Sequence, residues 1–347
     1  MESPIILVIG SLNTDLITRT TRVPAAGETL ISQSFDTGSG GKGANQAVAC
    51  ARLSRRERDD GSSADVVVRM IGAVGDDTFG QDLIEGLQLN GVMTEDISVM
   101  SGEKTGVACI IVEEQTGENR ILMSPNANFS LRPADFTSLP ASLTKPDLIV
   151  LQLEIPLDTT LQILETAKEQ GIPVLMNPAP AQVLPKEAYG AVTHLIVNES
   201  EAAIIAEISE QKPRWSEWGE HIERIIALGV QHVTITLGAE GVIYLDTSLQ
   251  MMWQLPAEKV KVVDTTAAGD TFVGAYSVAL MKYIRSPVHS SKGMAAVVSW
   301  ANAAAAKTVE RNGAQSAIPW LDEVREYTYA GGPGGTSFDE WRRREAD

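Results

Sequence analysis

The residues with the clearest chemical potential lie in segment 263–274, VDTTAAGDTFVG. An apolar alternation precedes the segment and an almost unbroken apolar run follows it to Ile284, which predicts a strand, a tight turn and a buried helix. Ala267, Ala268 and Gly269 are small enough for the backbone to approach a ligand. The first amides of the helix would face that ligand, and the helix dipole favours an anion such as phosphate. We therefore expect an anion cradle here.

Asp270 stands at the same corner of the chain. A carboxylate beside a phosphate-binding helix start is unfavourable unless it handles a proton, so it suggests a base that activates a hydroxyl for phosphoryl transfer. Aspartate is also a preferred helix-capping residue. From this segment alone, the base and the cap are equally well supported.

Composition describes an ordinary globular chain of 347 residues with 44% hydrophobic content, enough for one or two domains. A net charge of −17 argues against nucleic acid or an anionic membrane as the main partner. The amino terminus lacks a basic flank, and no later apolar run is long enough to span a bilayer. Cys50 and Cys109, expected as packed thiols, fit a reducing compartment. We expect a cytoplasmic protein, with the nucleus as a second location.

Short apolar runs alternate with helical patterns along most of the chain. The runs expected as strands of a buried parallel sheet cover residues 5–10, 66–74, 147–151, 173–176, 194–197, 233–237 and 242–245. The helical patterns cover residues 44–53, 78–90, 158–170, 199–207, 217–228, 269–284 and 292–310. This alternation predicts a layered α/β domain whose ligand lies at the carboxyl ends of the strands.

Two regions break the alternation, because each pairs strands without an intervening helix. Residues 16–22 with 28–37, and 106–113 with 119–123, predict β pairs joined by turns. Such strands can form a lid that excludes water from a reaction, or they can merely extend a sheet edge. Segments 54–64 and 209–216 have the composition of solvated additions, and 331–347 that of a flexible tail.

A glycine-rich segment, GSGGKGANQA at 38–47, is the second chemical feature. It matches the G-x-G-x-x-G spacing of dinucleotide folds, but that motif should end the first strand of a βαβ unit, and here the first strand ends earlier. Its backbone can approach a ligand, and Asn45 can both donate and accept hydrogen bonds. Asn13 and Asp15 offer the same chemistry after the first strand. These residues suit sugar hydroxyls, although each alone is also a common turn residue.

Six short motifs stand in a fixed order along the chain. They are GSLNTD at 10–15, GGKGANQA at 40–47, NPAP at 177–180, NESE at 198–201, TLG at 236–238 and DTTAAGDT at 264–271. In this order they resemble the ribokinases, which belong to the PfkB-type carbohydrate kinases, over residues 5–320. The resemblance implies a three-layer α/β sandwich, a single domain over 1–330, a β lid from about 12–38 and 104–124, and a homodimer formed through the lids.

The resemblance also implies roles for individual residues. Asp270 would be the base acting on the 5-hydroxyl of ribose, and Ala267, Ala268 and Gly269 would form the anion hole. Asn13, Asp15, Gly41, Lys42, Asn45 and Glu154 would bind the sugar. Asn198 and Glu201 would organise magnesium, largely through water. ATP would contact Asn198, Glu201, Thr236, Gly238, Gly241, Gly269 and Asn302.

A monovalent cation, usually potassium, is a further expectation of the resemblance. Its ligands would be the Asp264 carboxylate and carbonyls of Thr266, Thr308, Arg311 and Gly313; oxygens of this kind suit a hard cation. The chain departs from the family pattern at 316–317, where it has Ser-Ala and the family usually has a small residue or proline followed by serine. The hydroxyl expected at 317 is missing, and Ser316 or a water could replace it.

The expected function is ATP-dependent phosphorylation of D-ribose at O5. Kinases of deoxyribose, fructose or a nucleoside such as adenosine remain open, although a nucleoside site needs apolar or aromatic residues around a base, and aromatics make up only 5% of this chain. A non-catalytic sugar-binding protein is a second class, which ATP turnover with ribose would exclude. A dinucleotide enzyme is a third, weakened by the position of the glycine motif.

Overall fold

The structure is a computed structural model of the whole chain. It describes residues 3–56, 64–115, 118–140, 144–208, 218–247, 249–285, 293–324 and 336–337. The predicted insertion at 209–216 lies outside these residues, as do most of the insertion at 54–64 and most of the tail. No helix among the described residues is long and apolar enough to cross a membrane.

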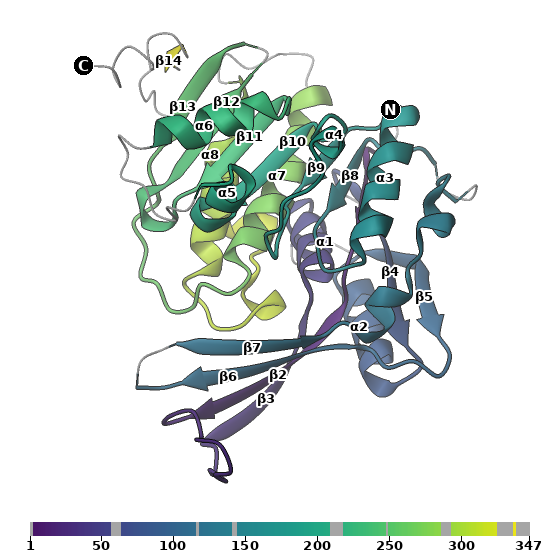
Figure 1. The fold of residues 1–347 in the computed structure, drawn as a ribbon, viewed down its shortest axis with the longest axis vertical. Helices are drawn as coiled ribbons and strands as arrows, with labels where there is room; N and C mark the ends of the chain where they lie inside the picture. Colours follow the sequence, from purple (N-terminus) through teal and green to yellow (C-terminus); the bar gives the residue numbers. More distant parts are fainter. Residues whose placement is uncertain are drawn as a thin grey trace.

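A central mixed sheet forms the middle layer of the fold (Figure 1). Side by side lie β14 (Thr336–Ser337), β13 (Met251–Leu255), β12 (Val242–Asp246), β11 (His232–Thr236), β10 (His194–Asn198), β9 (Val174–Met176), β8 (Leu148–Leu151), β1 (Ile5–Ile9), β4 (Val67–Gly75) and β5 (Met93–Met100). From β11 to β5 neighbouring strands are parallel, whereas β12, β13 and β14 are antiparallel.

Helices cover both faces of this sheet, because successive strand side chains point to opposite sides. In β1, Ile6 and Val8 enter one hydrophobic core, while Leu7 and Ile9 enter the other. The first core is closed by α1 (Lys42–Leu53), α2 (Thr78–Leu89), α7 (Ala268–Arg285) and α8 (Gly293–Thr308). The second is closed by α3 (Leu157–Glu169), α4 (Lys186–Tyr189), α5 (Glu199–Ile205) and α6 (Trp218–Ala227). The predicted three-layer α/β architecture is confirmed.

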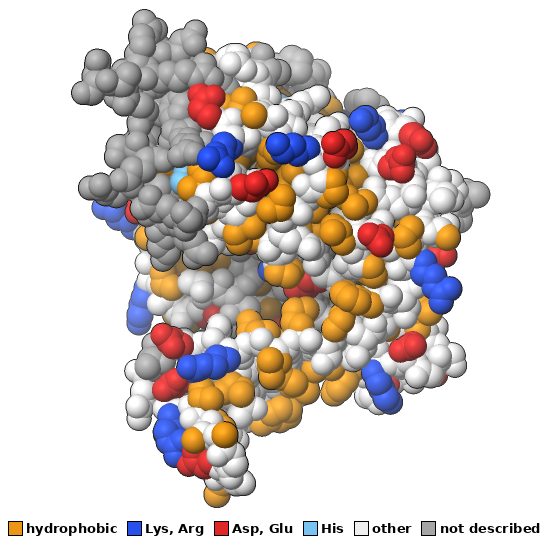
Figure 2. Space-filling model, in the orientation of Figure 1, with side chains coloured by type: hydrophobic (Ala, Val, Ile, Leu, Met, Phe, Trp, Pro, Cys, Tyr) orange, Lys and Arg blue, Asp and Glu red, His pale blue; other side chains and the backbone are white. Residues whose placement is uncertain are grey.

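A separate four-stranded sheet extends from the main body (Figure 1). Its strands lie in the order β3 (Ser34–Gly40), β2 (Asn13–Thr20), β6 (Gly106–Glu113) and β7 (Asn119–Ser124). The two predicted β pairs are thus joined into one sheet by parallel pairing of β2 with β6. Figure 2 shows the surface hollowed between this small sheet and the main body. The small sheet agrees with the predicted lid; its bounds and the single-domain assignment stay predictions.

Several local predictions were wrong. Residues 28–33, expected in a strand, precede β3 and form none. β12 was expected in a parallel sheet, but it follows β11 by a short turn that reverses the chain and is antiparallel. β5 and β13 were missed; Glu95 and Asp96 interrupt the apolar pattern of β5, and Gln254 shortens that of β13. Cys50 is buried as expected, but Cys109 is exposed on the small sheet.

Candidate active site

Asp270 lies where the beginning of α7 meets the beginning of α1. Its side chain is buried, with 7% exposure of the residue. Oδ2 accepts a hydrogen bond from Asn45 Nδ2 at 3.0 Å, and Oδ1 accepts one from Gln46 Nε2 at 3.0 Å. Asp270 is the third residue of α7, and its carboxylate faces α1 rather than the amides of its own helix. This geometry favours a functional carboxylate over the helix cap that the sequence left open.

The turn before α7 has the shape expected of an anion cradle. Ala267 adopts a left-handed conformation with φ 58°, which is costly for a residue with a side chain and turns the chain sharply into the helix. Outside its chain neighbours and its own helix backbone, a Cβ added at Gly269 would meet no atom of the described residues within 4 Å. Gly269 therefore borders open space, and it lines two cavities at once.

The predicted sugar residues come together at the carboxyl ends of β1 and β8. Glu154 Oε2 accepts hydrogen bonds from Ser11 Oγ at 2.6 Å and from the Lys42 amide at 3.0 Å. Gly41 has φ 86°, and a Cβ there would lie 2.7 Å from the Asn13 amide nitrogen, so only glycine fits this approach of two backbones. The structure brings these distant segments together, and their roles in sugar binding stay predictions.

Carboxyl groups crowd this site, and their mutual repulsion changes how they ionise. Burial, reinforced by the charges of Glu154 and Asp270, raises the pKa of Asp15 to about 7. Burial also raises the pKa of Glu154, although Lys42 and Ser11 oppose the shift. Burial disfavours the charged Lys42 ammonium, but the carboxylates of Asp270, Glu154 and Glu201 outweigh it and raise the pKa of Lys42. Lys42 is thus a cation among carboxylates.

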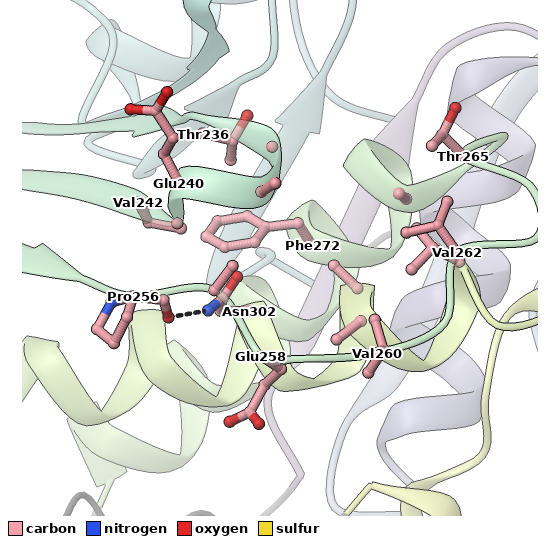
Figure 3. Close-up of a pocket in the computed structure, with 18 of the residues that line it drawn as sticks. Thr236, Glu240, Val242, Pro256, Glu258, Val260, Val262, Thr265, Phe272 and Asn302 are labelled. Carbon is pink, nitrogen blue, oxygen red and sulfur yellow. Dashed lines mark hydrogen bonds between the residues drawn. The ribbon is translucent and has the colours of Figure 1, made fainter.

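Two adjoining cavities open beside Asp270. The smaller, of about 210 Å³, is lined by Lys42, Asn198, Glu201 and Asp270 among others. The larger, of about 630 Å³, lies between α8 and the β11–β12 turn (Figure 3). Thr236, Thr265 and Gly269 line both. A ligand in the larger cavity can therefore extend to Asp270.

The larger cavity is lined by five of the seven residues predicted to bind ATP, and the other two, Asn198 and Glu201, line the smaller one. Thr236, Gly238, Gly241 and Asn302 all line it. In Figure 3 the Phe272 ring lies at the cavity between the β12 side and Asn302. Asn302 Nδ2 donates to the Pro256 carbonyl at 2.9 Å, which fixes α8 against the loop after β13. Gly241 has φ 103°, and a Cβ there would collide with the Leu255 carbonyl, so this glycine also has a packing role.

Asn198 and Glu201 lie at the start of α5, and each side chain accepts a hydrogen bond from the other's backbone amide. The Asn198 side chain accepts from the Glu201 amide at 2.8 Å, and the Glu201 side chain accepts from the Asn198 amide at 2.9 Å. This reciprocal capping box explains the spacing of the motif. Burial raises the pKa of Glu201, opposed by Asn198 and Lys42. Both side chains still line the smaller cavity, where they can hold a hydrated metal ion through water.

The predicted cation site is organised around Asp264. Oδ1 accepts from the Thr266 amide at 2.9 Å and from Thr266 Oγ1 at 2.7 Å, and Oδ2 accepts from the Gly313 amide at 3.0 Å. Partial burial disfavours the charged form, but these hydrogen bonds outweigh it and lower the pKa of Asp264. The carboxylate thus ties the turn before α7 to the loop at 313.

The other residues predicted to bind the cation differ in the partners of their side chains. The Thr308 side chain is buried and donates to Thr271 Oγ1 at 2.8 Å. The Arg311 side chain forms an ion pair with Glu323, so only its carbonyl is a candidate ligand. Ser316 Oγ donates to the Asn312 carbonyl at 3.2 Å and lies against Gly313. Ser316 is thus on the same loop, while Ala317 is buried.

Several buried amides belong to the site although the sequence gave them no individual role. Asn128 donates to Asn13 Oδ1 at 2.8 Å and exchanges hydrogen bonds with both backbone groups of Leu12. Gln46 and Asn177 lie within the six motifs, which was a signal for them. Asn128 lies in a 3₁₀ helix, Asn126–Ser130, outside every motif, and nothing in the sequence pointed to it.

Comparison with known proteins agrees with this geometry. The model for pfkB family carbohydrate kinases matches residues 4–321. The chain belongs to this family. Among the relatives of this kinase, a protein named ribokinase from Schizosaccharomyces pombe is 42% identical over 322 residues, covering 92% of this chain and 96% of that protein.

Solved structures agree with this membership. The structure of ribokinase from Giardia lamblia has a TM-score of 0.79 and 30% identity, covering 93% of this chain and 98% of that one. The structure of Arabidopsis thaliana ribokinase complexed with ribose and ATP has a TM-score of 0.76 and 26% identity, with the same coverage. The predicted class of enzyme, a kinase that transfers phosphate to an alcohol, is confirmed.

Proposed function

We propose that this kinase transfers the γ-phosphoryl group of ATP to O5 of D-ribose, giving D-ribose 5-phosphate and ADP. The observation that carries the proposal is the position of Asp270, a buried carboxylate bonded to Asn45 of the sugar site and lining the same cavity as Gly269 of the cradle. Both relatives and solved structures named ribokinase cover most of the chain. The residues assigned to the acceptor, the base and the phosphate cradle thereby lie next to one another.

The chemistry assigned to Asp270 is proton removal from the attacking hydroxyl. As the sugar oxygen bonds to the γ-phosphorus, its proton passes to the carboxylate and ADP leaves with the electrons of the broken phosphorus–oxygen bond. Phosphoryl transfer depends mostly on positioning and on charge stabilisation, so the base has a modest share. The amides at the start of α7 and the Lys42 ammonium supply positive potential beside the transferred group.

The sugar site assigned to ribose has a donor and acceptor set of the right kind. Asn45 Oδ1 is buried and has no hydrogen-bond partner among the residues that the structure describes, a costly arrangement that a ligand hydroxyl would relieve. Asp15 and Glu154 offer carboxylate oxygens, and Asn13 is held in place by Asn128. A small polyhydroxylated sugar matches this set, because it can both donate and accept at each position.

Magnesium and potassium are assigned by the donors available. Asn198 and Glu201 would hold hydrated Mg²⁺, which when bound neutralises charge on the ATP phosphates. Asp264 with the carbonyls of Thr266, Thr308, Arg311 and Gly313 would hold K⁺ and keep the turn before α7 in its phosphate-ready shape. Ser316 takes the place of the missing hydroxyl at 317 in this proposal, since it lies against Gly313.

Assembly and location complete the proposal. Figure 2 shows hydrophobic side chains gathered on the small sheet, and Phe35, Ile121, Leu122 and Met123 of β3 and β7 are exposed. An apolar surface of this kind suits a partner, and we assign it to a homodimer through the two small sheets. The expected location is the cytoplasm and nucleus, and no nucleic-acid partner is proposed because the chain carries a net charge of −17.

The test is a coupled ADP-release assay over ribose, deoxyribose, fructose, adenosine and uridine at saturating ATP. We expect the highest kcat/KM with ribose. A higher value with any other acceptor would contradict the ribose assignment and leave the kinase class standing. ATP turnover absent with every acceptor would instead favour a sugar-binding protein.

A further inference from the structure

Gln46 connects Asp270 to a chain of buried amides. Its side chain is fully buried on α1. Nε2 donates to Asp270 Oδ1 at 3.0 Å and to Asn177 Oδ1 at 3.0 Å, and Oε1 accepts from Gln152 Nε2 at 2.7 Å. Both amide hydrogens of Gln46 and its oxygen are therefore engaged.

The direction of this chain of amides is fixed by a backbone group. Asn177 Nδ2 donates to the Ile196 carbonyl of β10 at 2.9 Å, so Asn177 Oδ1 must face Gln46. If the Gln46 amide rotated by half a turn, its oxygen would face the oxygens of Asn177 and Asp270, and its nitrogen would face the Gln152 nitrogen. Each hydrogen bond would then become a repulsion, which disfavours the rotated state.

We propose that Gln46 is a positioning residue, held by Gln152 and Asn177, that binds Oδ1 of Asp270 and so orients Oδ2, on the Asn45 side of the carboxylate, toward the sugar hydroxyl. Oδ2 is bonded to Asn45, the residue of the sugar site whose own oxygen lacks a partner within the described part of the chain. During transfer the hydroxyl O–H bond breaks, an Oδ2–H bond forms, and the sugar oxygen bonds to phosphorus as ADP leaves. The inference rests on the proposed role of Asp270 as base.

Other charged groups also face Asp270, and a test of Gln46 must leave their charges unchanged. They are Asp15 of β2, Glu154 after β8, Lys42 of α1 and Glu201 of α5. None of them makes a hydrogen bond to Gln46 among the described residues. Substitution of Gln46 therefore removes one donor to Asp270 without removing a charge from the site.

The test is a double-mutant cycle of Gln46→Met and Asp270→Asn, measured as single-turnover formation of sugar phosphate. Methionine retains the approximate volume of glutamine and lacks its amide. In the wild-type background we expect Gln46→Met to lower the rate roughly 10- to 100-fold, because misplacing a reacting group costs about this much. KM for ribose and ATP should change by less than about threefold, since ground-state contacts remain.

In the Asp270→Asn background, Gln46→Met should have little further effect, because residues that act through one another are not additive. A merely structural role would lower the rate by the same factor in both backgrounds, and that result would overturn the inference. Gln152→Met is a second variant, which keeps Gln46 but removes the hydrogen bond to its Oε1, one of the three that fix its amide. It should lower kcat by a smaller factor than Gln46→Met does. If Gln46→Met does not fold, an unchanged kcat in Gln152→Met would overturn the inference.

A matched control is Ser277→Ala, which removes a buried hydroxyl from α7 that donates to the Val273 carbonyl at 2.8 Å. It should leave kcat within about twofold, since the hydroxyl contacts the Val273 carbonyl and the Cys50 thiol, neither of which lines the site. The outcomes also separate the two proposals. If Asp270→Asn keeps near-normal turnover, the proposed role of Asp270 as the base fails; if it lowers turnover and the cycle is additive, only the role of Gln46 fails.

Discussion

A substitution at Gly269 should impair phosphate binding and leave folding almost unchanged. Outside its chain neighbours and its own helix backbone, a Cβ there meets no atom of the described residues within 4 Å, so the first side-chain atom of Gly269→Val has room. Glycine and valine differ in helix propensity by only about 0.5 kcal/mol, so the free energy of unfolding should change by less than about 1 kcal/mol. The branched side chain would occupy the open space at the cradle. Loss of one donor of such a cradle lowers kcat about 10²–10³-fold, and we expect a fall of this size.

The assay is steady-state ADP release together with urea unfolding of the same preparations. Gly86→Val is the matched control, because Gly86 also lies in a helix and its added Cβ would be 3.8 Å from Ser39 Oγ, an ordinary contact. The control should match wild-type kcat. A normal kcat in Gly269→Val would show that the phosphate cradle does not lie at Gly269. If kcat fell together with the free energy of unfolding, the inference that Gly269 borders open space would be wrong.

Three further predictions address the cation, ionisation and assembly. Asp264→Asn should abolish any rate difference between potassium and a bulky organic cation, and equal rates in the wild type would refute the cation site. Burial raises the pKa of Asp15 from 3.8 to about 7, so the folded state holds a proton in that window that the unfolded state releases. The contribution of Asp15 to the free energy of unfolding should therefore fall by a few kcal/mol as pH rises from 4 to 7, and Asp15→Asn should remove this fall. A pH-independent difference between the two proteins would contradict this. Leu122→Asp, at a residue 71% exposed, should give monomers in sedimentation velocity, whereas Leu89→Asp, at one 82% exposed on α2, should not; equal masses would refute the interface.

The sequence was most informative where function and structure use the same residues. Small residues before an apolar helix predicted the cradle, because only a few local conformations allow a backbone to face an anion. The predicted parallel strands lie in one sheet because their apolar runs are buried on both faces. Asn45 and Asp270 are 225 positions apart, and only their motifs indicated that they meet.

The features that the sequence did not predict depend on long-range packing, which leaves no local pattern. β5 is an edge strand that contains Glu95 and Asp96, so it lacks the continuous apolar run of its neighbours. The union of two β pairs into one sheet is a parallel contact between segments more than 80 residues apart. Asn128 acts on Leu12 and Asn13 from a short 3₁₀ helix, and an isolated asparagine there is indistinguishable from a turn residue.

The most direct test of the central claim is the single-turnover rate of ribose 5-phosphate formation in wild type and Asp270→Asn, with ribose affinity measured by calorimetry on both. A general base contributes about 10²–10⁴-fold, so we expect the rate to fall at least 10²-fold while ribose still binds. Near-normal phosphate transfer by a folded, ribose-binding Asp270→Asn would contradict the assignment of Asp270 as the base.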